Sequence, residues 1–167
     1  DAYVLKDIID IYQLKDTDLA RDILTKIALQ LGSEVSIREI AASLGSNGVT
    51  VANYIEIFIK NYILISLPSF RTNTRKAVSE NRKLYFYDLG IRNILIDNLK
   101  PLKDRNDSGF LWENFLLLER MKFNNDKQDL VSGYFWRTHT GAELDYLEEK
   151  NGTLFGFEFK SGSKIVK

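Results

Sequence analysis

The chain has 167 residues, of which 44% are hydrophobic and 28% charged, with 23 Lys and Arg against 23 Asp and Glu. These values are typical of an ordinary folded globular protein of one domain or two small ones, and they exclude a largely disordered chain. The absence of cysteine excludes disulfides and thiolate metal sites and fits a reducing cytoplasm, where we expect the protein to act. No apolar run approaches the ~20 residues of a membrane span, so we expect no membrane partner. A net charge of zero means that nucleic acid would be bound through a local basic patch.

Apolar residues at helical spacing predict a first helix within residues 1–12 and a second one that Gly32 ends. Asp16 or Thr17 is the expected cap of the second helix. Its apolar positions recur every four residues, at Leu19, Ile23, Ile27 and Leu31.

A helix-turn-helix is predicted in the following segment. Ser36, with Glu39 three residues later, has the pattern of a capping box and begins a short helix. Gly45, Ser46 and Asn47 interrupt the pattern, and residues 49–60 then form the next helix. Two helices joined by a tight turn that contains Gly make a helix-turn-helix candidate.

Two strand patterns, residues 62–67 and 83–87, follow these helices and enclose a polar loop. Helices followed by such a hairpin predict a winged helix-turn-helix domain, which we place at residues 1–98. Between residues 71 and 83 the chain carries five cations against Glu80 alone, as expected for phosphate contacts. The predicted DNA-binding residues are Asn47, Thr50, Asn53, Arg71, Arg75, Lys76, Arg82 and Lys83. The alternative is a packing module in which Asn47 only turns and caps the chain.

Residues 99–108 have the composition of a solvated linker, because Pro101 is followed by alternating cations and acids. A second domain is expected over residues 109–167. It begins with a helix at residues 109–123 that is apolar nearly all round, which predicts burial on several sides. Glu113 within this helix needs a partner, either a metal-bound water or Arg120.

Three strands are predicted after this helix, at residues 133–138, 141–147 and in the run that ends at Lys160. Alternation places Glu143 and Asp145 on one face of the middle strand. The turn at residues 150–152 leads into a strand whose phenylalanines form one apolar face, opposite Glu158 and Lys160. Arg137 could point toward a phosphate or toward Glu143.

An aspartate on one strand and Glu-x-Lys on the next suit a metal-dependent phosphodiesterase. The carboxylates of Asp145 and Glu158 would bind Mg²⁺, while Lys160 would assist the attacking water and offset charge on the phosphate. The alternative is a solvated hairpin face with a Glu and Lys ion pair.

At these residues the chain resembles the PD-(D/E)XK nucleases. Asp145 matches their second motif, Glu158 and Lys160 match Glu-x-Lys, and Glu113 in GFLWENF matches the acidic residue of the preceding helix. The longer segments ILTKIALQLGSEVSIREIAASLG, VTVANYIEIFIKNYILISLP, KLYFYDLGIRN and FWRTHTGAELDYL with FEFK resemble the C-terminal region of uncharacterised bacterial and archaeal AAA+ ATPases. In these proteins a nucleotide-binding module precedes a winged helix and a nuclease-like domain.

This resemblance implies an α+β fold, with a winged helix followed by the helix and three-stranded sheet of a truncated nuclease-like domain. The chain has no phosphate-loop motif, so ATP would bind only in a preceding module of a longer protein, of which we expect this chain to be a piece. The implied partners are DNA and the protein's own ATPase module. Because the nuclease-like core is cut short, its phenylalanine face should be partly exposed or should form a homo-oligomer contact.

Two functions follow as hypotheses. The chain is either the DNA-engaging region of an AAA+ ATPase, in the sharper version a Mg²⁺-dependent DNA endonuclease, or a non-enzymatic module that binds DNA or protein and regulates the ATPase.

Overall fold

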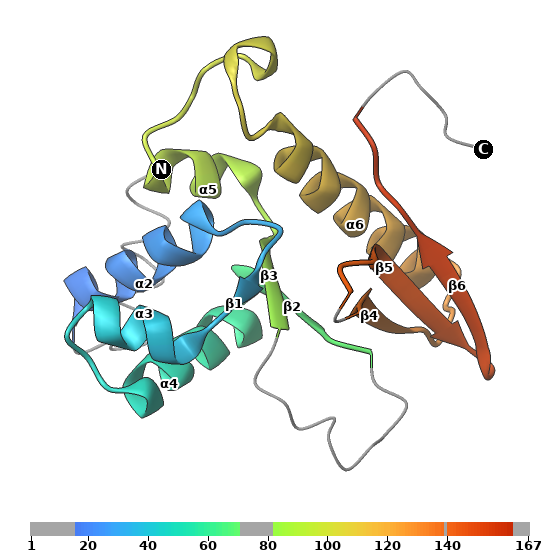
Figure 1. Ribbon diagram of the computed structural model, residues 1–167, viewed down its shortest axis with the longest axis horizontal. Coiled ribbons are helices and arrows are strands. Elements are labelled where there is room, and N and C mark those ends of the chain that lie inside the picture. The colour runs from blue at the N-terminus through green and yellow to red at the C-terminus, as the bar shows by residue number, and fades with distance from the viewer. Residues whose placement is uncertain (1–15, 71–81, 139, 162–167) are drawn as a thin grey trace.

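The computed structural model describes residues 16–70, 82–138 and 140–161. These residues form a mixed α+β fold with five α-helices, one short 3-10 turn and two three-stranded antiparallel sheets (Figure 1). The helix predicted within residues 1–12 lies outside the described residues, as do three predicted DNA contacts, Arg71, Arg75 and Lys76.

The first half begins with three capped helices. Asp16 caps α2 (Thr17–Leu29), Ser36 caps α3 (Ile37–Ser43) and Asn47 caps α4 (Gly48–Lys60). In each case the side-chain oxygen accepts a hydrogen bond from the backbone N–H three residues later, at 2.9, 3.3 and 2.8 Å in turn. These short polar side chains satisfy backbone donors that the helix cannot, which is why the helices begin where the sequence predicts.

A three-stranded sheet completes this half. Strands β2 (Leu64–Pro68) and β3 (Arg82–Phe86) pair antiparallel, and the two-residue strand β1 (Glu34–Val35) pairs with the other edge of β3, giving the order β1-β3-β2. The strand β1 was not predicted, because two residues are too short to show an alternating pattern.

The second half contains a long helix and another sheet. After α5 (Leu89–Leu95) and the 3-10 turn (Leu102–Asp104), the helix α6 (Ser108–Asp126) leads to β4 (Ser132–Arg137), β5 (Glu143–Lys150) and β6 (Thr153–Phe157). The sheet order is β4-β5-β6, and Asn151 and Gly152, both with positive φ, form the tight turn predicted between β5 and β6. The strand β6 ends at Phe157, so Glu158 and Lys160 lie on the segment after it.

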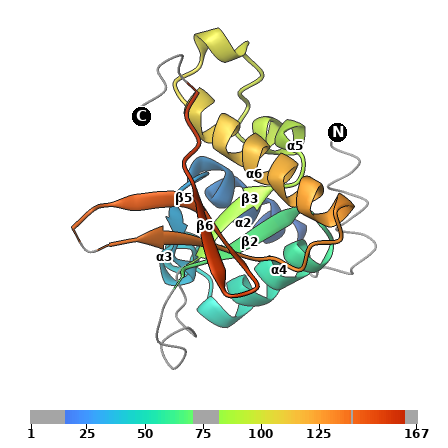
Figure 2. The same ribbon diagram turned by 90° about the vertical axis from the view of Figure 1, so that its right-hand side faces the viewer.

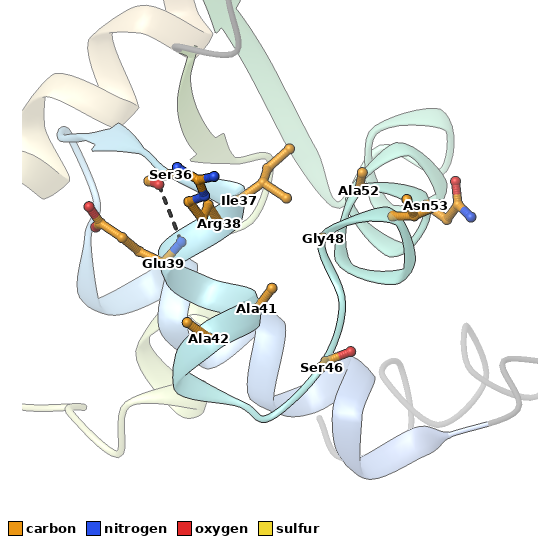
Figure 3. Close-up of a pocket in the computed structure, with 11 residues that line it drawn as sticks. Ser36, Ile37, Arg38, Glu39, Ala41, Ala42, Ser46, Gly48, Ala52 and Asn53 are labelled. Atoms are coloured by element: carbon orange, nitrogen blue, oxygen red, sulfur yellow. Dashed lines mark hydrogen bonds between the residues drawn. The ribbon is translucent and has the colours of Figure 1, made fainter.

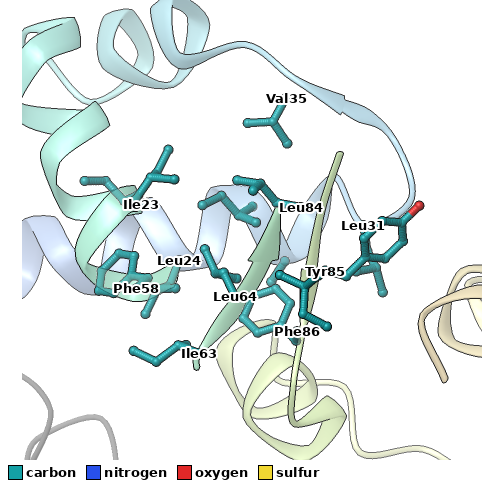
Figure 4. Close-up of a cluster of buried hydrophobic side chains, with 14 of the residues drawn as sticks. Ile23, Leu24, Leu31, Val35, Phe58, Ile63, Leu64, Leu84, Tyr85 and Phe86 are labelled. Atoms are coloured by element: carbon teal, nitrogen blue, oxygen red, sulfur yellow. The ribbon is translucent and has the colours of Figure 1, made fainter. Parts of the chain in front are cut away.

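One hydrophobic core runs through both halves. Ile23, Leu24, Phe58, Leu64 and Leu84 lie at its centre in the first half (Figure 4), and α6, β4 and β5 extend it with Leu111, Leu117, Phe135 and Tyr146. Seen from the side, the second sheet lies in front of β2 and β3, and α2 lies behind them (Figure 2). The two halves therefore pack against each other through β2 and β3.

Two backbone links join the sheets. Ser69 forms a parallel bridge with Phe135, and the Phe70 N–H donates to the Phe135 carbonyl at 2.7 Å. The second half thus contacts the backbone just after β2 as well as the side chains of the core.

The linker prediction is wrong for Arg105, whose side chain is 2% exposed. Its guanidinium donates to Asp107, to the Asn93 side chain and to the Asn98 carbonyl at 2.6–2.9 Å. Asp107 also accepts from Arg92 of α5. Alternating charges have the same sequence pattern whether they face water or each other, so spacing alone could not distinguish the two cases.

The helix α6 is not buried on several sides, contrary to the prediction. Its buried positions form a single stripe that includes the polar residues Glu113, Asn114 and Asn124. Large aromatic side chains on its other faces are exposed, namely Trp112, Phe115 and Phe123, and Phe110 at the start of the stripe is 46% exposed. The buried polar residues have partners on the sheets, so the core-facing stripe is not the most apolar one.

The phenylalanine face of β6 is only partly covered. Phe157 and Phe159 are half-buried, whereas Phe155 is 47% exposed. The partial exposure of this face agrees with the expectation for a nuclease-like core that is cut short.

Candidate functional site

A pocket of about 350 Å³ lies where the two halves meet. Its walls come from the α2–β1 connection, β3, α6, the facing ends of β4 and β5, and the segment after β6. All four predicted catalytic residues line it, Glu113, Asp145, Glu158 and Lys160, together with Gly32, Ser33, Glu34, Lys83, Phe110, Arg137 and Glu143. The four predicted catalytic residues, separated by up to 47 positions in the sequence, are thus brought to one cavity, and their chemical roles stay predictions.

A backbone hydrogen bond joins the aspartate to the Glu-x-Lys segment. The N–H of Phe159 donates to Asp145 Oδ2 at 2.7 Å. Phe159 lies between Glu158 and Lys160 in the sequence, so this bond holds both charged residues beside the aspartate.

Glu158 and Lys160 pair with each other at the surface of the pocket. Lys160 Nζ lies 2.6 Å from Glu158 Oε1, and both side chains are more than half exposed. The hydrogen bond to Glu158 raises the pKa of Lys160. An exposed pair of this kind contributes little to stability, so both side chains can exchange partners when a ligand enters.

A β-bulge lies beside Asp145 in the pairing of β5 with β4. Tyr134 faces Leu147 and Trp136 faces Leu144, so β5 uses one more residue than β4 between these pairs. A bulge rotates the side chains around it relative to a regular strand. Asp145 and Glu143 nevertheless both line the pocket, so the prediction that they share one side holds.

Glu113 is buried and has two partners on β3. The Tyr85 hydroxyl donates to Glu113 Oε1 at 2.6 Å, and Lys83 Nζ lies 3.5 Å from the same oxygen. Burial raises the pKa of Glu113, and the positive charge of Lys83 partly offsets that effect. The predicted partner Arg120 instead forms a two-point contact with Glu148 at 2.8 and 2.7 Å, so that pairing is wrong.

Lys83 belongs to this pocket and not to a DNA-facing surface. The residue is 2% exposed, and its Nζ lies 2.6 Å from Glu143 Oε1 and 5.6 Å from the centre of the Phe135 ring. The prediction that Lys83 contacts a DNA phosphate is therefore wrong, because a buried ammonium held by carboxylates does not reach DNA. Its inward direction follows from its place at the interior of the β1-β3-β2 sheet, where it faces α6.

The other described DNA candidates lie on or near α4. Asn47 caps the helix by accepting from the Thr50 N–H, Asn53 is exposed, and Arg82 pairs with Glu56 at 2.8 Å. An open pocket of about 1020 Å³ lies between the facing sides of α3 and α4, and small residues such as Ala41, Ala42, Gly48 and Ala52 line it (Figure 3). The cap accounts for Asn47 structurally, and Thr50 and Asn53 keep their predicted role as candidates.

Sequence reasoning missed Glu34, which lines the junction pocket, and Tyr85, which donates to the pocket residue Glu113. An aromatic residue in a strand and an acid beside a turn are too common to indicate a site. Arg137 bridges the halves weakly, with its guanidinium 3.8 Å from Glu34 and 3.9 Å from Glu143. The sequence analysis had given two directions for Arg137, toward a phosphate or toward Glu143, and the second agrees with this contact.

The pocket has the oxygen donors that Mg²⁺ prefers, but not a complete ligand set. Among residues 16–70, 82–138 and 140–161, no group of three or more His, Cys, Asp or Glu side chains is placed to hold a metal ion. Magnesium is often bound by one or two carboxylates, with water and substrate phosphate as its other ligands. Asp145 and Glu158 fit that kind of site and do not fit an all-protein cage.

Comparison with known proteins identifies the family but no activity. Residues 1–102, more than half of the chain, match the model named Domain of unknown function (DUF8612), and the chain belongs to this family. Residues 108–167 match Domain of unknown function (DUF4143), a family typically associated with proteins that contain an AAA ATPase.

Uncharacterized proteins of Mycobacterium bovis and Mycobacterium tuberculosis are each 30% identical to the chain over 141 residues, which is 83% of this chain and 31% of each relative. The chain thus spans about a third of the length of these relatives. No solved structure matches it.

Within the part of the chain that the structure describes, no helix is both long and apolar enough to cross a membrane.

Proposed function

We propose that this chain is the DNA-engaging C-terminal region of an AAA+ ATPase and that its junction pocket is a Mg²⁺-dependent phosphodiester site of the nuclease type. In this proposal the protein acts in the cytoplasm on DNA, and ATP binds only in the ATPase module of the longer protein. The observation that carries the proposal is the meeting of Glu113, Asp145, Glu158 and Lys160 in one pocket.

The order of the elements supports a winged helix in the first half. Three helices and a short strand precede β2 and β3, and the connection between these strands, residues 69–81, carries Arg71, Arg75 and Lys76 in its sequence. A basic connection next to a helix-turn-helix suits contacts with DNA phosphates. The proposal assigns DNA contact to this connection and to the exposed side of α4 at Thr50 and Asn53.

The donor set supports phosphodiester chemistry in the second half. Asp145, held by the Phe159 N–H, and Glu158 would hold the cation, which when bound supplies Lewis-acid stabilisation of the phosphate charge. Lys160 lies beside both carboxylates and would turn from Glu158 toward the phosphate or the attacking water. Glu113 would act from the helix by fixing the polar floor of the pocket through Lys83 and Tyr85.

A nuclease assay with the full-length protein tests this proposal. With Mg²⁺ or Mn²⁺ present, we expect cleavage of DNA that falls about 100-fold or more in Asp145→Asn and Lys160→Ala. Lys150→Ala is the matched control, since Lys150 pairs with Asp129 elsewhere on the surface. Cleavage by Lys160→Ala at the wild-type rate would show that the mechanism is wrong.

A second candidate is a non-enzymatic module that binds DNA or protein and regulates the ATPase. It is favoured by the absence of a three-donor group among the described residues and by the ammonium of Lys83, which already neutralises acids in the pocket. This candidate predicts no metal-dependent cleavage. If its partner is DNA, binding should weaken as the salt concentration rises and in the variants Arg75→Ala and Lys76→Ala. Binding that is unaffected by salt and by these substitutions indicates a protein partner.

A further inference from the structure

One cation that lines the junction pocket, between the two halves, comes from the first half of the chain. Lys83 extends from β3 into the pocket, and its side chain is 3% exposed. Its ammonium lies 2.6 Å from Glu143 of β5 and 3.5 Å from Glu113 of α6. One cation therefore serves two carboxylates from two different elements of the second half.

These two carboxylates require a cation in this position. Glu113 is buried, and the side chain of Glu143 is about one-third exposed. Two acids that share a partly buried site repel each other and lose hydration, and a positive charge that contacts both offsets these two costs. The Tyr85 hydroxyl gives Glu113 a hydrogen bond but no charge. In pockets rich in carboxylates, a divalent cation is the usual alternative to a buried ammonium.

We propose that Lys83 is a positioning residue of the pocket, whose ammonium holds Glu113 and Glu143 together where a further divalent cation would otherwise bind. The inference deepens the proposed function, on which it rests for the assignment of one cation to Asp145 and Glu158. It also makes the pocket composite, because the ammonium that contacts both acids comes from β3 in the first half, whereas the acids themselves belong to residues 108–167.

Counting bound metal tests this role. Mn²⁺ is titrated into the full chain without nucleotide, and the bound ions are counted by electron paramagnetic resonance. We expect Lys83→Met to bind one more Mn²⁺ per chain than the wild type, and Lys83→Arg, which keeps the charge, to bind the same number as the wild type. Equal counts for the wild type and Lys83→Met would overturn the inference.

The Asp145→Asn background separates this inference from the proposed function. Asp145→Asn should remove one Mn²⁺ from the wild-type count, and Lys83→Met should still add one in that background. If the wild type binds no Mn²⁺ and cleaves no DNA, the nuclease proposal fails. The extra ion of Lys83→Met would support the inference even then, because it depends only on Glu113 and Glu143.

Thermal unfolding gives a second measurement. Without Mn²⁺, Lys83→Met should unfold at a lower temperature than the wild type, because two acids have lost their cation. Mn²⁺ should restore part of that loss, since a ligand that binds the folded state stabilises it. Lys150→Met removes a surface ion pair with Asp129, and we expect its unfolding temperature to be no more responsive to Mn²⁺ than that of the wild type.

If Lys83→Met does not fold, Glu143→Gln retains the lysine and decides the question. If Lys83 occupies the position of a metal ion, Glu143 does not bind metal in the wild type. The Mn²⁺ affinity of Glu143→Gln should then stay within about twofold of the wild-type affinity, well below a tenfold change, which corresponds to about 1.4 kcal/mol. A loss of tenfold or more would identify Glu143 as a ligand and overturn the inference.

Discussion

Asn114 shows how one residue can join the two halves. Its side chain is fully buried on α6, where Oδ1 accepts from the Phe86 N–H at 2.9 Å and Nδ2 donates to the Phe86 carbonyl at 2.8 Å. The amide thus satisfies both backbone groups at the end of β3. An asparagine side chain carries a carbonyl acceptor beside an NH₂ donor, and these two groups match the N–H and the carbonyl of Phe86.

We expect Asn114→Ala to lower the free energy of unfolding by about 2–4 kcal/mol, because two buried backbone groups lose their partners. Chemical denaturation measures the change. Asn125→Ala on the exposed side of the same helix is the control and should cost less than about 1 kcal/mol. Equal losses in the two variants would contradict the role given to Asn114.

At the scale of elements, the connection between α5 and α6 is held by charge. Asp107 accepts hydrogen bonds from Arg105 and from Arg92, whose side chains are almost fully buried. These contacts, that from Arg105 first, hold the pKa of Asp107 well below its usual range. The connection is thereby fixed against α5 and determines where α6 begins, and α6 in turn carries Glu113 into the pocket.

This pKa predicts a dependence of stability on pH. A carboxyl group whose pKa is lower in the folded state adds stability above its unfolded pKa, and that stability is lost as pH falls through the folded value. The wild type should therefore lose stability as pH falls below about 5. Asp107→Asn should be about 2–4 kcal/mol less stable at pH 7, with two arginines left unpaired, and should change less with pH.

Denaturation at pH values from 7 to the acid limit of folding measures both effects. Asp104→Asn, on the exposed 3-10 turn of the same connection, should follow the wild-type pH dependence. A pH profile for Asp107→Asn as steep as that of the wild type would contradict the role of this carboxylate.

For the whole molecule, the shared core predicts cooperative unfolding. Both tryptophans, Trp112 and Trp136, lie in the second half, whereas most of the helices lie in the first. The hydrophobic core extends across both halves, and so do the contacts made by Lys83, Tyr85 and Asn114. Unfolding of one half would therefore expose apolar and charged groups of the other half, so we expect the two halves to unfold together.

We expect tryptophan fluorescence and far-ultraviolet circular dichroism to report one coincident unfolding transition. Leu84→Ala in β3, at the buried centre of the first half, should lower stability by about 2–4 kcal/mol and move both signals together. A shift of the dichroism signal alone would show that the halves unfold independently.

Much of the local structure could be predicted from the sequence. The caps at Asp16, Ser36 and Asn47 act within three residues of themselves, so their partners are fixed by spacing. The turn at Asn151 and Gly152 is also local, because positive φ at both positions selects these residue types. The residue types at Glu113, Asp145, Glu158 and Lys160 indicated a phosphodiester site, and the structure places them in one pocket.

Only the tertiary structure decided which groups face one another. Lys83 has the sequence context of a basic DNA-binding loop, yet the packing of β3 against α6 and β5 places it between two carboxylates. Arg105 has the context of a solvated linker, yet its side chain is buried, and the bulge beside Asp145 appears only in the pairing of β4 with β5. The physical reason is that charge pairing and strand register depend on elements far apart in the chain, whereas caps and turns depend on neighbours.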